Sequence, residues 1–153
     1  MAIAVTIEAT VSRPPAEVFT QVADIERWPS WLIASGIIRV ERSSAGPLVE
    51  GEHLKVEQRA AGRAGTFEAQ VTALQPPSRL ALHGRDGDGV TIDIDAALAP
   101  GGNGDGTSLR WTIRIGLPLR YRMFESMARP QVERAAALDI EALRRRLEST
   151  AGG

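Results

Sequence analysis

The segment Val18–Trp31, VFTQVADIERWPSW, decides the fold. Its first half carries apolar residues at helical spacing, and it ends with Trp28 and Trp31, two of the three tryptophans in the chain. Pro29 marks a break, because the residue before a proline is pushed out of the helical conformation. Large aromatic side chains after so short an amphipathic helix need a deep apolar space to enter. A small domain that builds such a space is typical of proteins that bind apolar molecules.

Composition and charge narrow the class of protein. The 153 residues are 43% hydrophobic and 24% charged, with a formal net charge of -1, so we expect a single globular domain over residues 1–153. The balanced charge argues against binding to nucleic acid, and no apolar run reaches the length of a membrane span. The chain has no cysteines, which excludes disulfides and thiolate chemistry. The N-terminus lacks the pattern of a signal peptide, and we expect a cytoplasmic protein.

Apolar residues with a period of two predict one strand at the start of the chain and six more after residue 36. The first strand, Ile3–Val11, precedes a helix over Pro15–Ala23 and a short helical turn around Glu26–Leu32. Turns rich in glycine and proline separate the later strands. These strands are expected at Ile37–Glu41, Glu52–Ala60, Thr66–Leu74, Arg79–Arg85, Val90–Leu98 and Leu109–Ile115.

The last part of the chain, roughly Arg120 to Ser149, is predicted to form one long helix. Pro130 is expected to kink this helix or to mark a junction in it. The apolar face of the helix is broad and rich in small residues, which suits close packing on a sheet. That face is formed by Val132, Ala136, Ile140, Leu143 and Leu147.

Several short motifs resemble a known family. They are Ile7-Glu8-Ala9, Pro15-x-Glu17-Val18-Phe19-x-x-Val22-x-Asp24, Trp28-Pro29-x-Trp31, Val71-x-x-Leu74-x-Pro76-Pro77-x-Arg79-Leu80 and Asp139-x-x-x-Leu143-x-x-x-Leu147-Glu148. With the order of elements, they resemble the SRPBCC superfamily of START and Bet v 1-like proteins, in particular its bacterial polyketide cyclase/dehydrase and lipid-transport-like branch. The resemblance implies an α+β helix-grip fold, in which a seven-stranded antiparallel sheet curls around a long C-terminal helix and two short helices lie between strands 1 and 2. It also implies a largely apolar cavity between sheet and helix.

Five apolar residues are candidates for the wall of this cavity. Trp31 follows the short helices, and Trp111 lies on the inward face of the last strand. Phe67, Met123 and Met127 are similar candidates, and methionine adapts well to irregular shapes. Each of the five has two interpretations, as a core residue or as part of a ligand-binding wall. The second interpretation predicts a hollow where Trp111 and Met127 meet.

Two polar residues among apolar neighbours are candidate anchors for a ligand. Gln58 follows Leu54 and Val56 in phase and is expected to face inward, where its amide needs a partner. Asp139 lies near the centre of the apolar face of the last helix. A lone buried carboxylate is costly, so this residue is expected either to pair with an arginine or a hydroxyl, or to lie at a wet part of the cavity.

The chain carries no catalytic signature. The only histidines, His53 and His83, alternate out of phase with apolar neighbours and are expected to be exposed, as are Asp93 and Asp95 on the outer face of the sheet. No spacing is typical of a metal site, and no cofactor is expected. The remaining charged candidates are Arg120, Arg122 and Arg129. These arginines either are solvated or attract an acidic head group at the cavity mouth.

Three functions follow from these patterns. The first is binding of a small hydrophobic ligand, such as a lipid or a polyketide, in an internal cavity. The alternative is a polyketide aromatase/cyclase- or dehydratase-like enzyme, which requires convergence of the polar candidates Gln58, Asp139 and His83. The third is a protein-interaction module with a filled interior and an exposed apolar patch.

Overall fold

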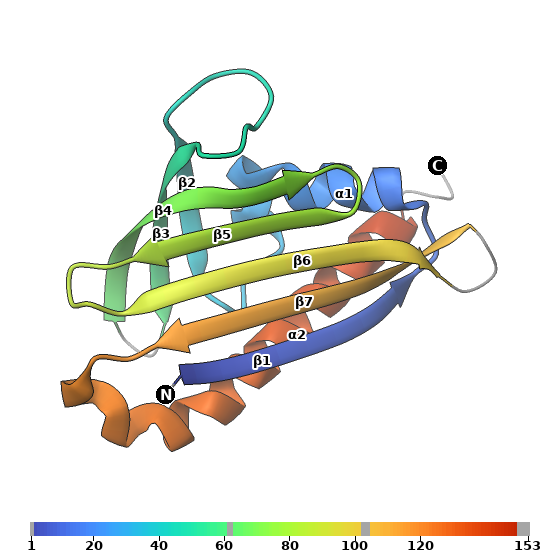
Figure 1. The fold of residues 1–153 in the computed structure, drawn as a ribbon. Helices are drawn as coiled ribbons and strands as arrows, with labels where there is room; N and C mark the ends of the chain where they lie inside the picture. Colours follow the sequence, from blue (N-terminus) through green and yellow to red (C-terminus); the bar gives the residue numbers. More distant parts are fainter. Residues whose placement is uncertain (1, 61–62, 102–104, 150–153) are drawn as a thin grey trace.

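The computed structural model describes residues 2–60, 63–101 and 105–149 (Figure 1). Its strands are β1 (Ala2–Val11), β2 (Ile37–Arg42), β3 (His53–Ala60), β4 (Arg63–Gln75), β5 (Arg79–Arg85), β6 (Thr91–Gly101) and β7 (Gly106–Gly116). Its helices are α1 (Pro15–Ala23), the 3-10 helix η1 (Ile25–Ser30), the 3-10 helix η2 (Leu119–Phe124) and α2 (Glu125–Ser149).

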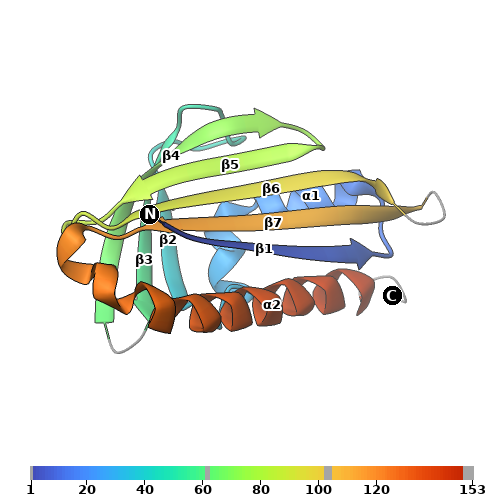
Figure 2. The ribbon, with the colours of Figure 1, turned by 60° about the horizontal axis from the view of Figure 1, so that its bottom comes forward.

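All seven strands pair in one antiparallel sheet with the order β1-β7-β6-β5-β4-β3-β2. The sheet curls, and α2 runs along its inner side, as Figure 2 shows. The short helices α1 and η1 connect β1 to β2 and close one end of the curl. The predicted helix-grip fold is confirmed.

The pairing of β1 with β7 shows how alternation builds this sheet. Val5 lies opposite Ile113, and both side chains are buried on the inner face. On the outer face Glu8 lies opposite Arg110 and forms an ion pair with it at 3.0 Å. A slip of one residue would exchange these two faces, so the apolar pattern sets the register.

The segment after β1 places the three tryptophans in one cluster. Proline at the start of α1 suits the first helical turn, where its missing N–H costs nothing. The indole of Trp28 donates a hydrogen bond to the carbonyl of Val22 at 2.8 Å, which ties η1 to the end of α1. The rings of Trp28, Trp31 and Trp111 meet edge to face, with centroids 5.4 to 6.3 Å apart. Such edge-to-face geometry is favourable between aromatic rings.

The C-terminal helical region differs from the predicted single helix. It begins as η2 at Leu119, after Pro118, and becomes the α-helix α2 at Glu125. The junction therefore lies between Phe124 and Glu125, while α2 continues through Pro130. Pro130 lies early in α2, where a missing N–H removes only one helical hydrogen bond.

The hairpin between β3 and β4 is also longer than predicted. The pairing continues to Ala60 and Arg63, and Gln58 lies opposite Gly65. The predicted connection over residues 62–65 is therefore mostly strand, with residue 62 outside the described part of the chain. Glycines favour turns, but Gly65 lies within β4 and pairs with Gln58.

Candidate functional site

A hollow of about 410 Å³ lies between the sheet and the N-terminal half of α2. This volume is within the range of pockets that hold small molecules. Its walls come from β2, β3, β6, β7, α2 and the segment between η1 and β2. We call this space the main hollow.

The sheet wall of the main hollow is mostly isoleucine. Ile92 and Ile94 of β6 lie opposite Ile115 and Ile113 of β7 in the ladder, so the four side chains form one continuous apolar surface. Trp111, which is fully buried, extends this surface toward the tryptophan cluster. Branched side chains stand stiffly on a pleated sheet, so this wall is well ordered.

The helix wall is made of small side chains. Ala128, Val132 and Ala135 follow one another at spacings of four and three residues, so they share one face of α2. Their side chains are too short to reach the isoleucines across the gap. The main hollow lies along this stretch of small side chains, from Ala128 to Ala135.

Two smaller spaces share walls with the main hollow. One of about 20 Å³ is lined by Trp28 and Phe67 among others. The other, of about 130 Å³, is lined by Phe67 and by Arg63 at its outer end. Gln58 and Ile92 border all three spaces. The apolar interior therefore extends from α2 under β3 and β4.

A polar clamp holds the segment between η1 and β2 against the rim of the main hollow. The two carboxylate oxygens of Asp139 on α2 accept hydrogen bonds from the backbone N–H groups of Ala34 and Ser35, at 2.8 and 2.9 Å. From the other side, the amide of Gln58 on β3 donates to the carbonyl of Ser35 at 2.8 Å. Asp139 and Gln58 thus converge on one short segment from a helix and a strand.

Electrostatics at Asp139 reflect two opposing effects. Burial of the side chain raises the pKa of this carboxyl group, because burial disfavours its charged form. The hydrogen bonds from Ser35 and Ala34 oppose that rise. The predicted pairing of Asp139 with a hydroxyl agrees with the effect of the Ser35 side chain, and the backbone N–H groups of Ala34 and Ser35 are partners that the sequence did not predict.

Gly36 allows the clamped segment to lie this close to β3. Its φ angle is +76°, which favours glycine, and a Cβ atom here would lie 1.9 Å from the carbonyl oxygen of Arg59. The N–H of Arg59 donates in turn to the carbonyl of Gly36 at 2.8 Å. The rim segment is thus fixed at both of its ends.

A second cluster of polar contacts joins β4, η2 and the turn between β5 and β6. Arg63 of β4 forms an ion pair with Asp86 at 3.3 Å and a further one with Asp88. Arg120 of η2 donates to the carbonyl of Asp88, and its guanidinium lies 4.8 Å from the ring centroid of Tyr121. This group ties η2 to the turn between β5 and β6.

Five of the seven sequence-predicted site residues are buried or half-buried in or near the main hollow. Gln58 and Trp111 line the main hollow, and Phe67 lines the two smaller spaces. Trp31 is buried in the tryptophan cluster and does not line the main hollow. Asp139 does not line the main hollow, but its carboxylate holds the segment between η1 and β2 through two hydrogen bonds to the backbone.

Met123 and Met127 are the clear correction to the predicted site. Their side chains are 79% and 63% exposed, and neither lines the main hollow. Ala128 is the first residue of α2 that lines the main hollow, and Met127 precedes it, at the end of the helix beyond this wall. The predicted meeting of Trp111 and Met127 is therefore wrong.

The polar candidates for catalysis do not come together. His83 is exposed on the outer face of the sheet, where its Nδ1 lies 2.7 Å from a carboxylate oxygen of Asp93. Gln58 and Asp139 converge on the backbone of Ser35, but only Gln58 lines the main hollow.

Most residues of the wall lie at positions that no sequence motif marks as a site. The wall residues that were not predicted include Ile37, Ile92, Ile94, Ile113, Ile115, Ala128, Val132 and Ala135. The period-two pattern marks the isoleucines as inward, and helical spacing marks the alanines and the valine as one face. Neither pattern predicts which inward-facing side chains lack a packing partner. That depends on the distance between α2 and the sheet.

Within the described ranges, no helix is long and apolar enough to cross a membrane. The family model described as polyketide cyclase / dehydrase and lipid transport matches residues 2–148. No curated protein sequence matches the chain.

Solved structures with the same fold include three proteins of low sequence identity. A START superfamily protein from Mycobacterium smegmatis has a TM-score of 0.77 at 16% identity, covering 96% of this chain and 98% of that one. The Zhui aromatase/cyclase from Streptomyces sp. R1128 has a TM-score of 0.76 at 17% identity, covering 97% and 94%. The protein TTHA0849 from Thermus thermophilus has a TM-score of 0.76 at 15% identity, covering 96% and 98%. At these identities the likeness concerns the fold.

Proposed function

The chain belongs to the polyketide cyclase/dehydrase and lipid transport family, and from this premise we propose that it binds a small hydrophobic molecule in the main hollow. A lipid or a polyketide fits the chemistry of the walls. The observation that carries the proposal is a space of about 410 Å³ with mostly apolar walls. Each buried methylene contributes about 0.8 kcal/mol, so a modest chain or ring system reaches micromolar affinity.

Gln58 is the proposed polar anchor for this ligand. One N–H of its side-chain amide donates to Ser35, while its carbonyl oxygen has no partner among the described residues. A half-buried amide oxygen favours a hydrogen-bond donor nearby. A ligand with a hydroxyl group at one end of an apolar body would supply that donor.

Dye binding tests the proposal. The fluorescent probe 1-aminoanthracene is titrated into the wild-type protein and into Ala135→Trp, in which a large side chain fills the main hollow. The matched control is Ala142→Trp, the same change at an exposed position on the same helix. We expect saturable binding to the wild type and the control, and loss of binding in Ala135→Trp at unchanged circular dichroism. Equal binding by all three proteins would place the dye elsewhere and contradict the proposal.

Native mass spectrometry supplies the identity of a natural ligand. The protein is purified without detergent and ionised under conditions that preserve complexes. A mass increment that is present in the wild type and absent in Ala135→Trp would come from a molecule held in the main hollow.

The two other functions have less support. Among the described residues that line the main hollow, Arg59 is the single charged side chain, so none of them is a carboxylate or a histidine that could act as a general acid or base. A protein-interaction module with a filled interior is disfavoured by the open space itself.

A further inference from the structure

Four large apolar side chains are exposed on η2 and the first turn of α2. They are Leu119 (80% exposed), Met123 (79%), Met127 (63%) and Phe124 (48%). Exposed apolar residues are usually scattered singly, whereas these four occur within nine residues of one continuous helical segment. We call them the apolar ridge.

The charges beside the apolar ridge are mainly positive. Residues 119–134 contain four arginines and two glutamates, in a chain with a net charge of -1. Arg122 and Arg134 form no ion pair with any described residue. Arg120 and Arg129 donate to backbone carbonyls, which leaves their charge unneutralised. The N-terminal end of α2 adds the positive end of a helix dipole.

The apolar ridge is adjacent to the main hollow. Phe124 lies one helical turn before Ala128, and Met127 lies one turn before Gln131. Ala128 and Gln131 both line the main hollow. Figures 1 and 2 show the whole segment at one end of the molecule, beyond the end of β7. A surface that covers the apolar ridge would therefore also lie next to that wall.

We propose that the apolar ridge docks the protein on the surface of a lipid bilayer that contains anionic phospholipids. Exposed apolar side chains on a helix flanked by arginines are the features that place a helix in the membrane interface. Arginines near an anionic surface strengthen such binding. Docking would turn the α2 wall of the main hollow toward the lipid. This surface function goes beyond ligand binding in the hollow and is independent of it.

Vesicle co-sedimentation tests the proposal on the full-length protein. One set of vesicles contains phosphatidylcholine with phosphatidylglycerol, and the other contains phosphatidylcholine alone. The apolar variant is Met123→Asp with Met127→Asp, and its control is Val49→Asp, an exposed apolar residue in the connection between β2 and β3. The charge variant is Arg122→Glu with Arg134→Glu, and its control is Arg114→Glu on the outer face of β7.

The expected result is binding of the wild type to the anionic vesicles, with weaker binding as salt is added. Both test variants should bind these vesicles at least about tenfold more weakly, while both controls bind as the wild type does. Because all substituted side chains are exposed, the melting temperatures should be unchanged, and a variant with a changed melting temperature is replaced by Met127→Gln. Dye binding without vesicles should be unaffected in every variant.

Two results would overturn the inference. One is absence of binding to anionic vesicles by a wild-type protein that still takes up the dye in solution. The other is a concentration-dependent dimer of the wild type, detected by light scattering, that the Met123→Asp and Met127→Asp variant abolishes. In that case a second copy of the chain covers the apolar ridge. Loss of dye binding alone would affect only the proposed ligand site.

Discussion

The two halves of α2 face different surroundings although they belong to one continuous helix. In the N-terminal half, small side chains border the main hollow and the methionines are exposed. In the C-terminal half, Ile140, Leu143 and Leu147 are all buried in the core. One half leaves space for a guest molecule, and the other half supplies the packing that keeps the helix on the sheet.

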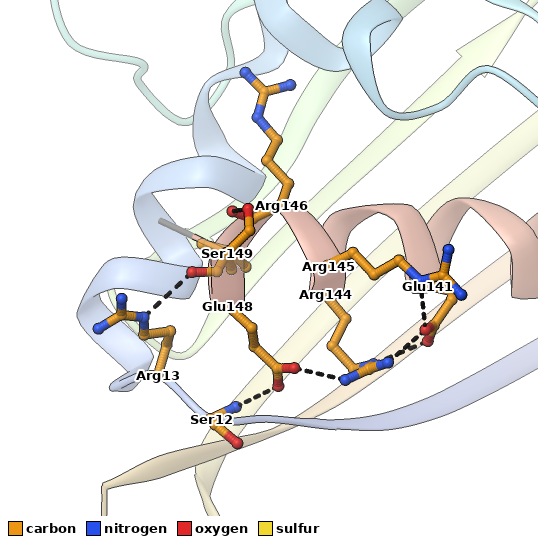
Figure 3. A network of polar contacts seen from close by, with 9 residues as sticks. Ser12, Arg13, Glu141, Arg144, Arg145, Arg146, Glu148 and Ser149 are labelled. Carbon is orange, nitrogen blue, oxygen red and sulfur yellow. Dashed lines mark hydrogen bonds and ion pairs between the residues drawn. The ribbon is translucent and has the colours of Figure 1, made fainter. Parts of the chain in front are cut away.

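Polar contacts reinforce the same division. Figure 3 shows a network at the C-terminal end of α2, where Glu148 accepts hydrogen bonds from the N–H of Ser12 at 2.9 Å and from Arg144 at 2.6 Å. Arg13 also donates to the carbonyl of Leu147 at 3.2 Å. These contacts fix the helix end to the turn after β1. The network that fixes the C-terminal end of α2 therefore lies at the end of the helix away from the main hollow.

The largest effect should come from a cavity in the anchoring half. Leu143→Ala should lower the free energy of unfolding by about 2–5 kcal/mol, because a fully buried side chain leaves a void. Val132→Ala, its counterpart on the main hollow, should cost about 1 kcal/mol or less, since its side chain already borders open space. Urea unfolding of both variants checks the difference. Equal losses would mean that the two halves are packed alike.

Removal of the Asp139 carboxylate should have the next largest effect. In Asp139→Ala the N–H groups of Ala34 and Ser35 lose their acceptors, which should cost about 1–3 kcal/mol of unfolding free energy. Gln58→Ala removes a single hydrogen bond to the same segment and should cost less. Urea unfolding gives both values, and hydrogen exchange at Ala34 and Ser35 should rise in Asp139→Ala. Unchanged exchange there would contradict the role of the clamp.

The pH dependence of stability should differ in sign between Asp139 and Glu141. Burial raises the pKa of Asp139 above 3.8, so its contribution to stability is full below that value and is lost as pH rises through the raised pKa. Hydrogen bonding by Arg144 lowers the pKa of Glu141 to about 2, so its contribution is present above 4.5 and is lost as pH falls through about 2.

Unfolding curves over acidic pH can separate the two groups. In the wild type, the contribution of Asp139 to the unfolding free energy falls as pH rises above 3.8, and Asp139→Asn should abolish this fall. The contribution of Glu141 grows as pH rises from about 2 to 4.5, and Glu141→Gln should abolish this growth. If both variants changed the pH dependence of the unfolding free energy in the same direction, the opposite pKa shifts of Asp139 and Glu141 would be contradicted.

The smallest effect should come from the exposed end of the network. Arg144→Gln removes ion pairs with Glu141 and Glu148 that lie at the protein surface, and surface pairs contribute little. The loss should shrink further as salt is added. Thermal unfolding at low and high ionic strength measures it. A loss as large as that of Leu143→Ala would show that the network, rather than the core, anchors the helix.

The sequence predicted the fold much better than the site. Period-two apolar residues and the motif around Trp28 identified the strands and the family, because these signals come from packing that every member of the fold repeats. The wall at Ile92 and Ala128 was missed, because a hollow depends on the distance between two elements and has no local pattern. Met127 is an apolar residue of the long helical pattern, but it lies before Ala128, the first wall residue of α2, and is exposed.

The tryptophan cluster gives the protein a built-in optical reporter. All three indoles of the chain are in mutual contact, so excitation of any one can migrate among them before emission. Trp111 is the member that borders the main hollow. The tryptophan fluorescence of the molecule therefore comes from one cluster. A ligand that entered the main hollow would shift the emission maximum or quench the emission, and no added label would be needed.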